Sequence, residues 1–246
     1  MDWKTPDRFA VQVHFTDHGG PGTPVVLLHG GGRDSSDWDP VVARLRALGA
    51  RPVTFDLRLH GGAWTWERAL ADVRAVAERL SPARPVVAGH SLGGMVATLW
   101  AGREDCPLAL NLDGHGNPTS PAHYLGLPDA AAGHRAVQAA LARMAEGLDE
   151  DFRAVMRAID ALDLFAAYRR ARGPLVVTRG TRSMAGLLPE TAQEPWRAYE
   201  RWTLSELRRT AAAVDSFRLC ETATGHDVHL EDPDLVVSLI APALGG

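Results

Sequence analysis

The sequence predicts an α/β fold, with a mostly parallel central sheet flanked by helices and one helical insertion. Three observations favour this fold. Short apolar, β-branched runs alternate with amphipathic stretches along most of the chain. The run at residues 85–88 leads directly into Gly-His-Ser-Leu-Gly at 89–93, which suits a tight turn from a strand into a helix. The chain has 246 residues, enough for one α/β domain with a sizeable core.

The first half of the chain alternates strands and helices. Residues 9–15 alternate apolar and polar side chains, which is typical of an edge strand or an exposed strand. Residues 24–28 form a continuous apolar run, which predicts a central strand buried on both faces. The elements expected next are a helix at 38–48 that ends at Gly49, a strand at 52–56, a helix at 66–80 and the strand at 85–88. This order implies parallel strands joined by right-handed crossovers.

The second half contains a long segment that interrupts this alternation. After a strand at 107–112, residues 119–172 contain no strand candidate and favour helices, most clearly at 150–171. We therefore predict a helical lid at 118–172, inserted into a core formed by 1–117 and 173–246. The expected remaining elements are strands at 174–178 and 216–220, a helix at 194–213 and a closing helix at 233–239.

Composition and charge exclude several classes of partner. The net charge is −4 with both signs interspersed, so no basic block indicates nucleic acid binding. No apolar run approaches ~18 residues, and the N-terminus lacks the pattern of a secretory signal, so we expect a cytoplasmic protein that binds no membrane. The two cysteines lack the spacing of metal ligands, and we predict no metal site.

Ser91 is the candidate nucleophile. Glycine stands two residues before it and two residues after it, between a predicted strand and a predicted helix. A turn this tight leaves no room for a side chain at either glycine and exposes the hydroxyl beside the N-terminus of the following helix. An unassisted serine hydroxyl keeps its proton at neutral pH, so Ser91 needs a base within hydrogen-bonding reach.

Four segments resemble, in order, the motifs of the α/β-hydrolase superfamily. Residues 28–32 (Leu-His-Gly-Gly-Gly) resemble its oxyanion-hole loop, and residues 89–94 match its nucleophile elbow. Residues 56–61 resemble its D-x-R-G-H-G stretch, with Leu59 where glycine is usual. Residues 225–233 resemble its catalytic-histidine loop. The resemblance covers nearly the whole chain and implies the fold predicted above and a serine hydrolase that needs no cofactor.

The resemblance also indicates the base and the oxyanion donors. His226 is favoured as the base, because it follows the last strand at the carboxyl edge of the sheet, where Ser91 also lies. His229 is the alternative. The backbone N–H groups of Leu92 and Gly31 are expected to bind the oxyanion, with Gly32 as the alternative to Gly31. The other histidines near these motifs are expected to brace loops: His29, His60 and His90.

Three residues are weaker candidates for substrate contact. His115 follows the strand at 107–112 and could face the pocket from the start of the lid. Trp64 follows the loop at 60–62 and could line the pocket, or could equally be a core aromatic at the start of a helix. Gly32 could also contact substrate, because a glycine run allows the backbone to approach it closely.

The acid of the triad departs from the commonest family pattern. Residues 179–184 resemble a family ending R-G-x-x-S-D in which Met184 replaces the aspartate. A methionine cannot orient an imidazole or stabilise its protonated form. Some relatives take the acid from the end of the preceding strand, which is Asp113 in this chain, and we favour Asp113. Other carboxylates remain as alternatives: Asp160, Asp163 and Glu190.

The expected function is hydrolysis of a carboxylic ester or a lactone on a small-molecule acyl substrate, through an acyl-enzyme intermediate. A thioesterase and a carbon–carbon bond hydrolase are alternatives, because the same triad serves all of them and the lid shapes the pocket. The alternative from another class is a catalytically silent ligand-binding member of the fold, for which Met184 is the only support. The sequence does not indicate an oligomeric state.

Overall fold

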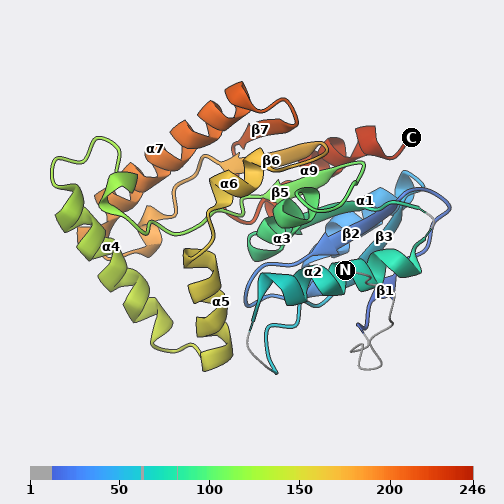
Figure 1. Ribbon diagram of the computed structural model, residues 1–246, viewed down its shortest axis with the longest axis horizontal. Coiled ribbons are helices and arrows are strands. Elements are labelled where there is room, and N and C mark those ends of the chain that lie inside the picture. The colour runs from blue at the N-terminus through green and yellow to red at the C-terminus, as the bar shows by residue number, and fades with distance from the viewer. Residues whose placement is uncertain (1–12, 62–63, 82, 246) are drawn as a thin grey trace, which may run out of the picture.

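A twisted sheet lies at the centre of the computed structural model, which describes residues 13–61, 64–81 and 83–245 (Figure 1). Its strand order is β1-β3-β2-β4-β5-β6-β7, and β1 is antiparallel to β3 while all other neighbours are parallel. The strands are β1 (Thr16–Asp17), β2 (Pro24–Leu28), β3 (Arg51–Phe55), β4 (Val86–His90), β5 (Ala109–Leu112), β6 (Leu175–Gly180) and β7 (Phe217–Thr222). The prediction of a mostly parallel sheet flanked by helices is confirmed.

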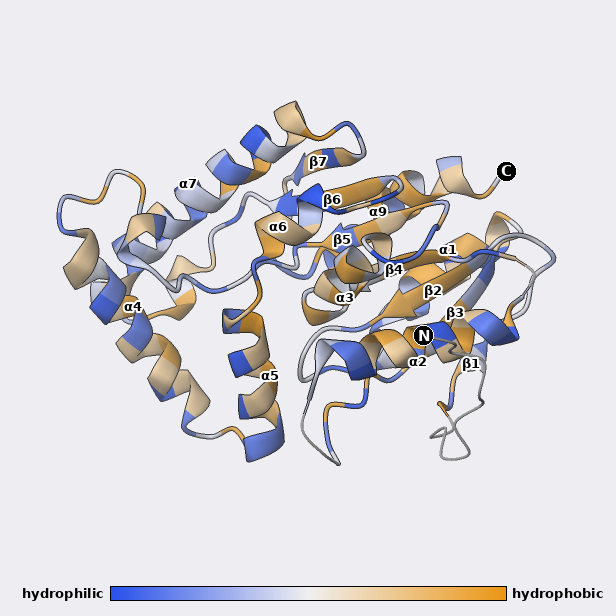
Figure 2. Cartoon of the chain, in the orientation of Figure 1, coloured by the Kyte–Doolittle hydropathy of each residue, from blue (hydrophilic) through white to orange (hydrophobic). Residues whose placement is uncertain are grey.

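The central strands are apolar because helices cover both of their faces. Every residue of β2, β4 and β5 is buried, as expected for parallel strands covered on both faces. Figure 2 shows these strands as the most hydrophobic part of the chain, whereas hydrophilic residues alternate with apolar ones along the outer helices. The pairing of Leu28 with Gly89 and of His90 with Leu112 brings the carboxyl ends of three strands to one edge.

Two hydrophobic clusters attach helices to the two faces of the sheet. The helices are α1 (Asp39–Ala47), α2 (Trp66–Arg79), α3 (Leu92–Ala101), α4 (Ala130–Ala145), α5 (Glu150–Asp160), α6 (Leu164–Arg169), α7 (Glu190–Ala213), α8 (Val228–Glu231) and α9 (Pro233–Ile240). One cluster joins α1 and α9 to the sheet, and the other cluster joins α2, α3 and α6 to the opposite face. Four short 3₁₀ turns complete the described elements: Ser35–Trp38, Pro121–His123, Ala185–Leu187 and Ala241–Ala243.

The segment between β5 and β6 is helical, as predicted. It contains α4, α5 and α6, and in Figure 1 α4 and α5 lie to one side of the sheet. A third hydrophobic cluster, which includes Val137 and Ala198, packs α4 against α7. The boundaries of a lid at 118–172 stay a prediction. None of the helices in the described part of the chain has the length and apolarity that a membrane crossing requires.

The prediction of a strand at 9–15 is not confirmed. Residues 9–12 lie outside the described residues, and residues 13–15 are not in a strand. Val13 is buried in the core and Phe15 packs against it, so their apolar pattern reflects packing without ladder hydrogen bonds. The edge strand is instead β1, whose Thr16 pairs with Thr54 of β3. Alternation predicts which side chains are buried but does not fix the residues that pair.

Candidate active site

Ser91 lies in a strained turn between β4 and α3. Its φ is 50° and its ψ is −114°, a conformation that non-glycine residues rarely adopt. Its backbone N–H donates to the carbonyl of Leu112 at 2.9 Å, which anchors the turn to β5. A Cβ at Gly89 would lie 2.1 Å from the carbonyl carbon of Gly93, and a Cβ at Gly93 would lie 2.3 Å from the carbonyl oxygen of Leu28. Close backbone contact therefore requires glycine at both positions.

Asp113 lies in a second strained position, directly after β5. Its φ is also 50°, and its backbone N–H donates to Oγ1 of Thr178 at 3.1 Å. The side chain is 3% exposed. Its Oδ1 accepts the backbone N–H of Gly180 at 2.9 Å and a guanidinium N–H of Arg179 at 3.1 Å. Both donors belong to β6, so the parallel pairing of β5 with β6 orients this carboxylate.

The structure brings His226 to Asp113. Nδ1 of His226 lies 2.8 Å from Oδ2 of Asp113. His226 belongs to the loop between β7 and α8, and its backbone carbonyl accepts a hydrogen bond from Nε2 of His90 at 3.1 Å. Because an ionised carboxylate can only accept, Nδ1 carries a proton, and Nε2 is therefore the nitrogen of this ring that can act as a base.

The Asp113 carboxylate is charged despite its burial. Burial by itself raises the pKa of Asp113, because an apolar surrounding disfavours the anion. The nearby His115 imidazole, the hydrogen bond with His226 and the charge of Arg179 outweigh burial and hold the pKa of Asp113 well below its usual range. Nε2 of His115 lies 3.4 Å from Oδ1 of Asp113. The result is a fixed negative charge beside the imidazole of His226.

The other histidines near the motifs have different surroundings. His29 is buried and accepts the N–H of Leu57 at 2.8 Å, so it braces the glycine loop as predicted. His90 is buried and holds the backbone of His226. His229, the alternative base, is fully buried, with its ring 4.3 Å from that of His90. His60 is largely exposed, with Nδ1 lying 3.4 Å from a carboxylate oxygen of Asp149.

A cavity of about 220 Å³ connects these groups. Ser91, Asp113 and His226 line it together with Gly31, Leu92 and His115. Most of the residues that the sequence did not indicate come from three elements: Phe152, Val155, Met156 and Ile159 of α5, Arg179 of β6, and Trp196, Tyr199, Glu200 and Thr203 of α7. Their spacing of three and four residues along each helix places them on one helical face, which was the signal available in the sequence.

The backbone groups beside Ser91 include free donors. Leu92 is the first residue of α3, and the N–H groups in the first turn of a helix have no partner within the helix. Gly31 lies in the turn after β2, where a Cβ would approach the ring of Phe152 to 3.2 Å. Both residues line the cavity with Ser91.

Two weaker candidates do not line this cavity. Trp64 is 5% exposed and belongs to the hydrophobic core, where its ring meets that of Trp66 edge to face. Of the two alternatives that the sequence left open for Trp64, the structure favours the core aromatic. Gly32 is exposed, with a φ of 71°, and is not among the residues that line the cavity, so the structure gives it no part in the pocket wall.

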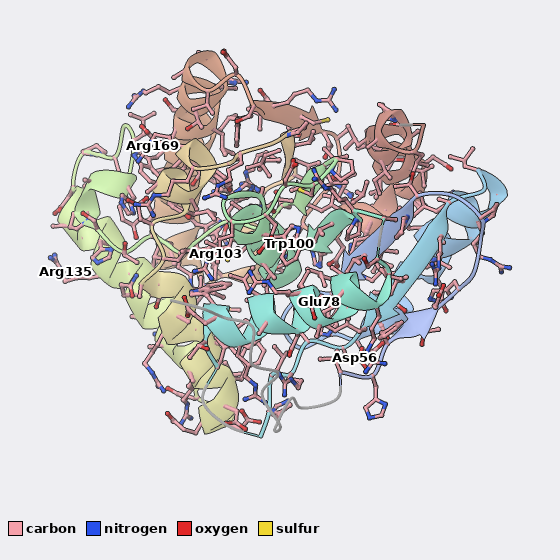
Figure 3. The ribbon with its side chains drawn as sticks, turned by 45° about the vertical axis from the view of Figure 1, so that its right-hand side comes forward. Asp56, Glu78, Trp100, Arg103, Arg135 and Arg169 are labelled. Atoms are coloured by element: carbon pink, nitrogen blue, oxygen red, sulfur yellow. The ribbon has the colours of Figure 1, made fainter. Side chains whose placement is uncertain are left out.

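A second cavity of about 500 Å³ adjoins the first one. The two share a wall that consists of His115, Gly116, Asn117, Ile159, Tyr199 and Thr203. Asp160, Asp163 and Arg169 line the second cavity but not the first, and Figure 3 labels Arg169. Of the carboxylates considered as alternatives to Asp113, Asp160 instead accepts a hydrogen bond from Asn117 at 2.9 Å. Glu190 lies in the first turn of α7 and lines neither cavity.

The described side chains at the cavity are not arranged as the ligands of a metal ion. Within residues 13–61, 64–81 and 83–245, no group of three or more histidine, cysteine, aspartate or glutamate side chains could hold a metal ion. The charged groups at the cavity pair with one another instead, as Asp113 does with His226 and Arg179.

Comparison with solved structures shows the same fold in several hydrolases. An enol-lactonase from Burkholderia xenovorans LB400 is similar with a TM-score of 0.65 and 22% identity, over 94% of this chain and 95% of that one. A thioesterase domain from the curacin biosynthetic pathway has a TM-score of 0.61 and 17% identity, over 93% and 94%. An E-2-(acetamidomethylene)succinate hydrolase has a TM-score of 0.62 and 16% identity, over 93% and 98%.

Sequence comparison identifies the family. An 87-residue stretch is 34% identical to the sn-1-specific diacylglycerol lipase ABHD11 of Xenopus tropicalis, and it spans 33% of this chain but only 27% of that lipase. Residues 25–239 match the sequence model of the alpha/beta hydrolase family, and this range covers the parallel part of the sheet from the second residue of β2 onward and the helices inserted between β5 and β6. The chain belongs to the alpha/beta hydrolase family.

Proposed function

We propose that this protein is a serine hydrolase that cleaves a carboxylic ester or a lactone of a small-molecule acyl substrate through an acyl-enzyme intermediate. One observation carries the proposal. The Asp113–His226 pair, joined at 2.8 Å, lines the same cavity as Ser91 in its strained turn. A nucleophile, a base and a group that orients the base are the three parts that serine catalysis requires.

The first step is attack by Ser91 on the acyl carbonyl. Nε2 of His226 takes the hydroxyl proton, and Asp113 keeps the imidazole in the required tautomer and stabilises the imidazolium that forms. The N–H groups of Leu92 and Gly31 donate to the oxyanion as charge develops on it. His226 then protonates the leaving alcohol, and the acyl group stays on Oγ of Ser91.

The second step is hydrolysis of this acyl-enzyme. Nε2 of His226 takes a proton from water, the resulting hydroxide adds to the acyl carbon, and Ser91 leaves with the proton returned by His226. The proposed cycle uses side chains and backbone groups of this chain alone. The acid is released with no net change in the enzyme.

The walls of the cavity support a short, apolar acyl group. Met95 of α3 and an apolar face of α5 line the cavity beside Ser91, and its volume of about 220 Å³ is small. The larger neighbouring cavity is lined by more polar groups, including Asp160 and Arg169, and would receive the leaving-group side of the substrate.

Labelling with a fluorophosphonate probe tests the proposal. The wild-type protein is expected to be labelled at Ser91 and to hydrolyse short p-nitrophenyl esters, and Ser91→Ala is expected to lose both properties. The Ser91→Ala variant leaves the cavity and the Asp113–His226 pair intact, so it separates chemistry from binding. A ligand-binding protein on the same scaffold predicts that neither labelling nor turnover occurs, and that result would reject the proposal.

A matched pair of substrates separates the ester from the thioester reaction. An oxygen ester and a thioester with the same butyryl group present the same acyl chain to the cavity, so their relative kcat/KM reports the leaving group alone. A kcat/KM for the ester at least equal to that for the thioester is expected. A strong preference for the thioester would instead identify a thioesterase.

A further inference from the structure

We propose that Arg179 is a positioning residue for Asp113, held in place by Glu200. The proposal rests on the proposed function, because it concerns how the base of that reaction is oriented. Residues 179–184 resemble the family ending that normally carries the acid, yet Met184 stands in the place of the aspartate. The arginine at the first position of that ending is kept in this chain as Arg179.

The contacts of Arg179 form a bridge between two carboxylates. One guanidinium nitrogen lies 3.1 Å from Oδ1 of Asp113 and 3.4 Å from Oδ2. Another nitrogen lies 3.6 Å from Oε1 of Glu200 on α7. The side chains of Arg179, Asp113 and Glu200 are 12%, 3% and 14% exposed. A planar guanidinium can satisfy two carboxylates at once, whereas an ammonium group is a single point charge.

Glu200 is itself fixed by donors around the vacant acid position. Its Oε1 accepts the backbone N–H of Met184 at 3.1 Å and the indole N–H of Trp196 at 3.0 Å, and its Oε2 accepts the hydroxyl of Ser183 at 2.6 Å. Glu200 therefore occupies the surroundings that the family uses for the catalytic acid. Among the described hydrogen bonds and ion pairs, none joins Glu200 to His226; its charge instead anchors Arg179, and Arg179 reaches Asp113.

This bridge has an electrostatic consequence for the base. The positive charge of Arg179 keeps Asp113 ionised and opposes protonation of His226, which shares the same carboxylate. The charged and titratable groups that surround Asp113 and His226 come from several elements: His90 of β4, His115 after β5, Tyr168 of α6, Arg179 of β6, Tyr199 and Glu200 of α7, Asp227 before α8 and His229 within α8. Removing the charge of Arg179 should therefore make His226 easier to protonate.

The test compares Arg179→Met with Arg179→Lys, using a short neutral p-nitrophenyl ester. Arg179→Met is expected to lower kcat by roughly 10- to 100-fold, because a small misplacement of catalytic groups has effects of that order. KM should stay near the wild-type value, and the acid limb of the pH profile of kcat/KM should move up by roughly one unit. Arg179→Lys should keep the acid limb near its wild-type position and recover only part of kcat.

Glu200→Gln is the second variant, and it remains informative where Arg179→Met fails to fold. Loss of this anion should lower kcat less than Arg179→Met does and should move the acid limb in the opposite direction, to lower pH. Circular dichroism and the thermal midpoint check that each variant is folded. If Arg179 had only a structural role, the acid limbs of Arg179→Met and Glu200→Gln would not shift in opposite directions.

Each outcome tests either the positioning role of Arg179 or the proposed function. Wild-type kcat and an unshifted acid limb in Arg179→Met would overturn the positioning role, as would a loss confined to KM, which would identify Arg179 as a substrate contact. Fluorophosphonate labelling of the wild-type protein is measured first. If the wild type is not labelled, the proposed function fails. If the wild type is labelled and Arg179→Met is labelled as fast, only the positioning role fails.

Discussion

Among single residues, the candidate site depends most on Asp113 and its carboxylate. It accepts hydrogen bonds from His226, Arg179 and the N–H of Gly180 while it is almost fully buried. A buried charge with this many donors is held in one orientation, because any rotation would leave a polar group unpaired. The unusual φ of Asp113 carries the same implication, since strained backbone is retained where the surrounding structure fixes it.

Replacing Asp113 with asparagine should lower kcat/KM by about 10³- to 10⁴-fold. The amide would leave the shape intact but remove the charge that stabilises the imidazolium, an effect of this size in serine hydrolases. Rates are measured with a short p-nitrophenyl ester beside three matched variants: Asp160→Asn, Asp163→Asn and Glu190→Gln. These three should keep rates far above that of Asp113→Asn, because none of them is the partner of His226. A near-wild-type rate for Asp113→Asn together with collapse of one of the others would transfer the acid to that residue.

At the scale of elements, α5 forms one wall of the cavity. The residues that line it, among them Phe152, Val155 and Met156, recur on one face of the helix. Arg157 lies on the exposed face and pairs with Glu150. The strands and α3 hold the reacting groups, whereas α5 and α7 determine the shape of the space beside them. Under the proposed function, catalysis and selectivity therefore reside in different elements, as expected for a fold that serves many substrates.

Narrowing the cavity from α5 should change selectivity more than chemistry. Met156→Trp is expected to raise the ratio of kcat/KM for the acetyl ester to that for the butyryl ester by about 10-fold or more, because a methylene in an apolar pocket has an effect of that order. Arg157→Gln, on the exposed face of the same helix, is the control and should leave the ratio unchanged. An unchanged ratio in Met156→Trp would show that the acyl chain does not lie against α5.

At the scale of the whole molecule, two buried histidines couple stability to pH. Burial lowers the pKa of His229 to about 4, opposed by the nearby Asp37 carboxylate. Burial also lowers the pKa of His90, with the rings of His229 and His226 adding to the effect. Both are neutral in the folded protein at pH 5, whereas an unfolded histidine takes up a proton below about pH 6.5. The unfolded state therefore binds more protons, and stability falls as pH falls.

Replacing His229 with leucine should flatten this dependence. For His229 the window runs from about pH 6.5 down to about 4, so the wild type should lose about 2 kcal/mol between pH 7 and pH 5 through this residue alone. The free energy of unfolding is measured by denaturant titration at both pH values. His229→Leu should lose correspondingly less, and above pH 7.5 its difference from the wild type should not depend on pH. An equal loss in both proteins would contradict the assigned burial effect.

Local patterns were sufficient to predict most of the elements. The apolar runs at 24–28 and 85–88 each correspond to a strand of the sheet, because a strand buried on both faces must be apolar throughout. The edge strand was harder to predict. The side chains of Val13 and Phe15 are apolar because they pack in the core, and these residues do not pair with a neighbouring strand. Trp64 could not be assigned from sequence, because a tryptophan at a helix start suits a core and a pocket equally well.

By itself the sequence determined the individual strands and the strained turn at Ser91, because both follow from interactions among near neighbours. A glycine two residues before and two residues after Ser91 is a steric requirement that the chain carries locally. The tertiary structure decided which carboxylate meets His226. Asp113 precedes His226 by 113 residues, and the two meet only because β5, β6 and β7 pair in parallel and end at one edge. The same pairing brings Arg179 beside Asp113, and no local pattern records a contact between strands so far apart in sequence.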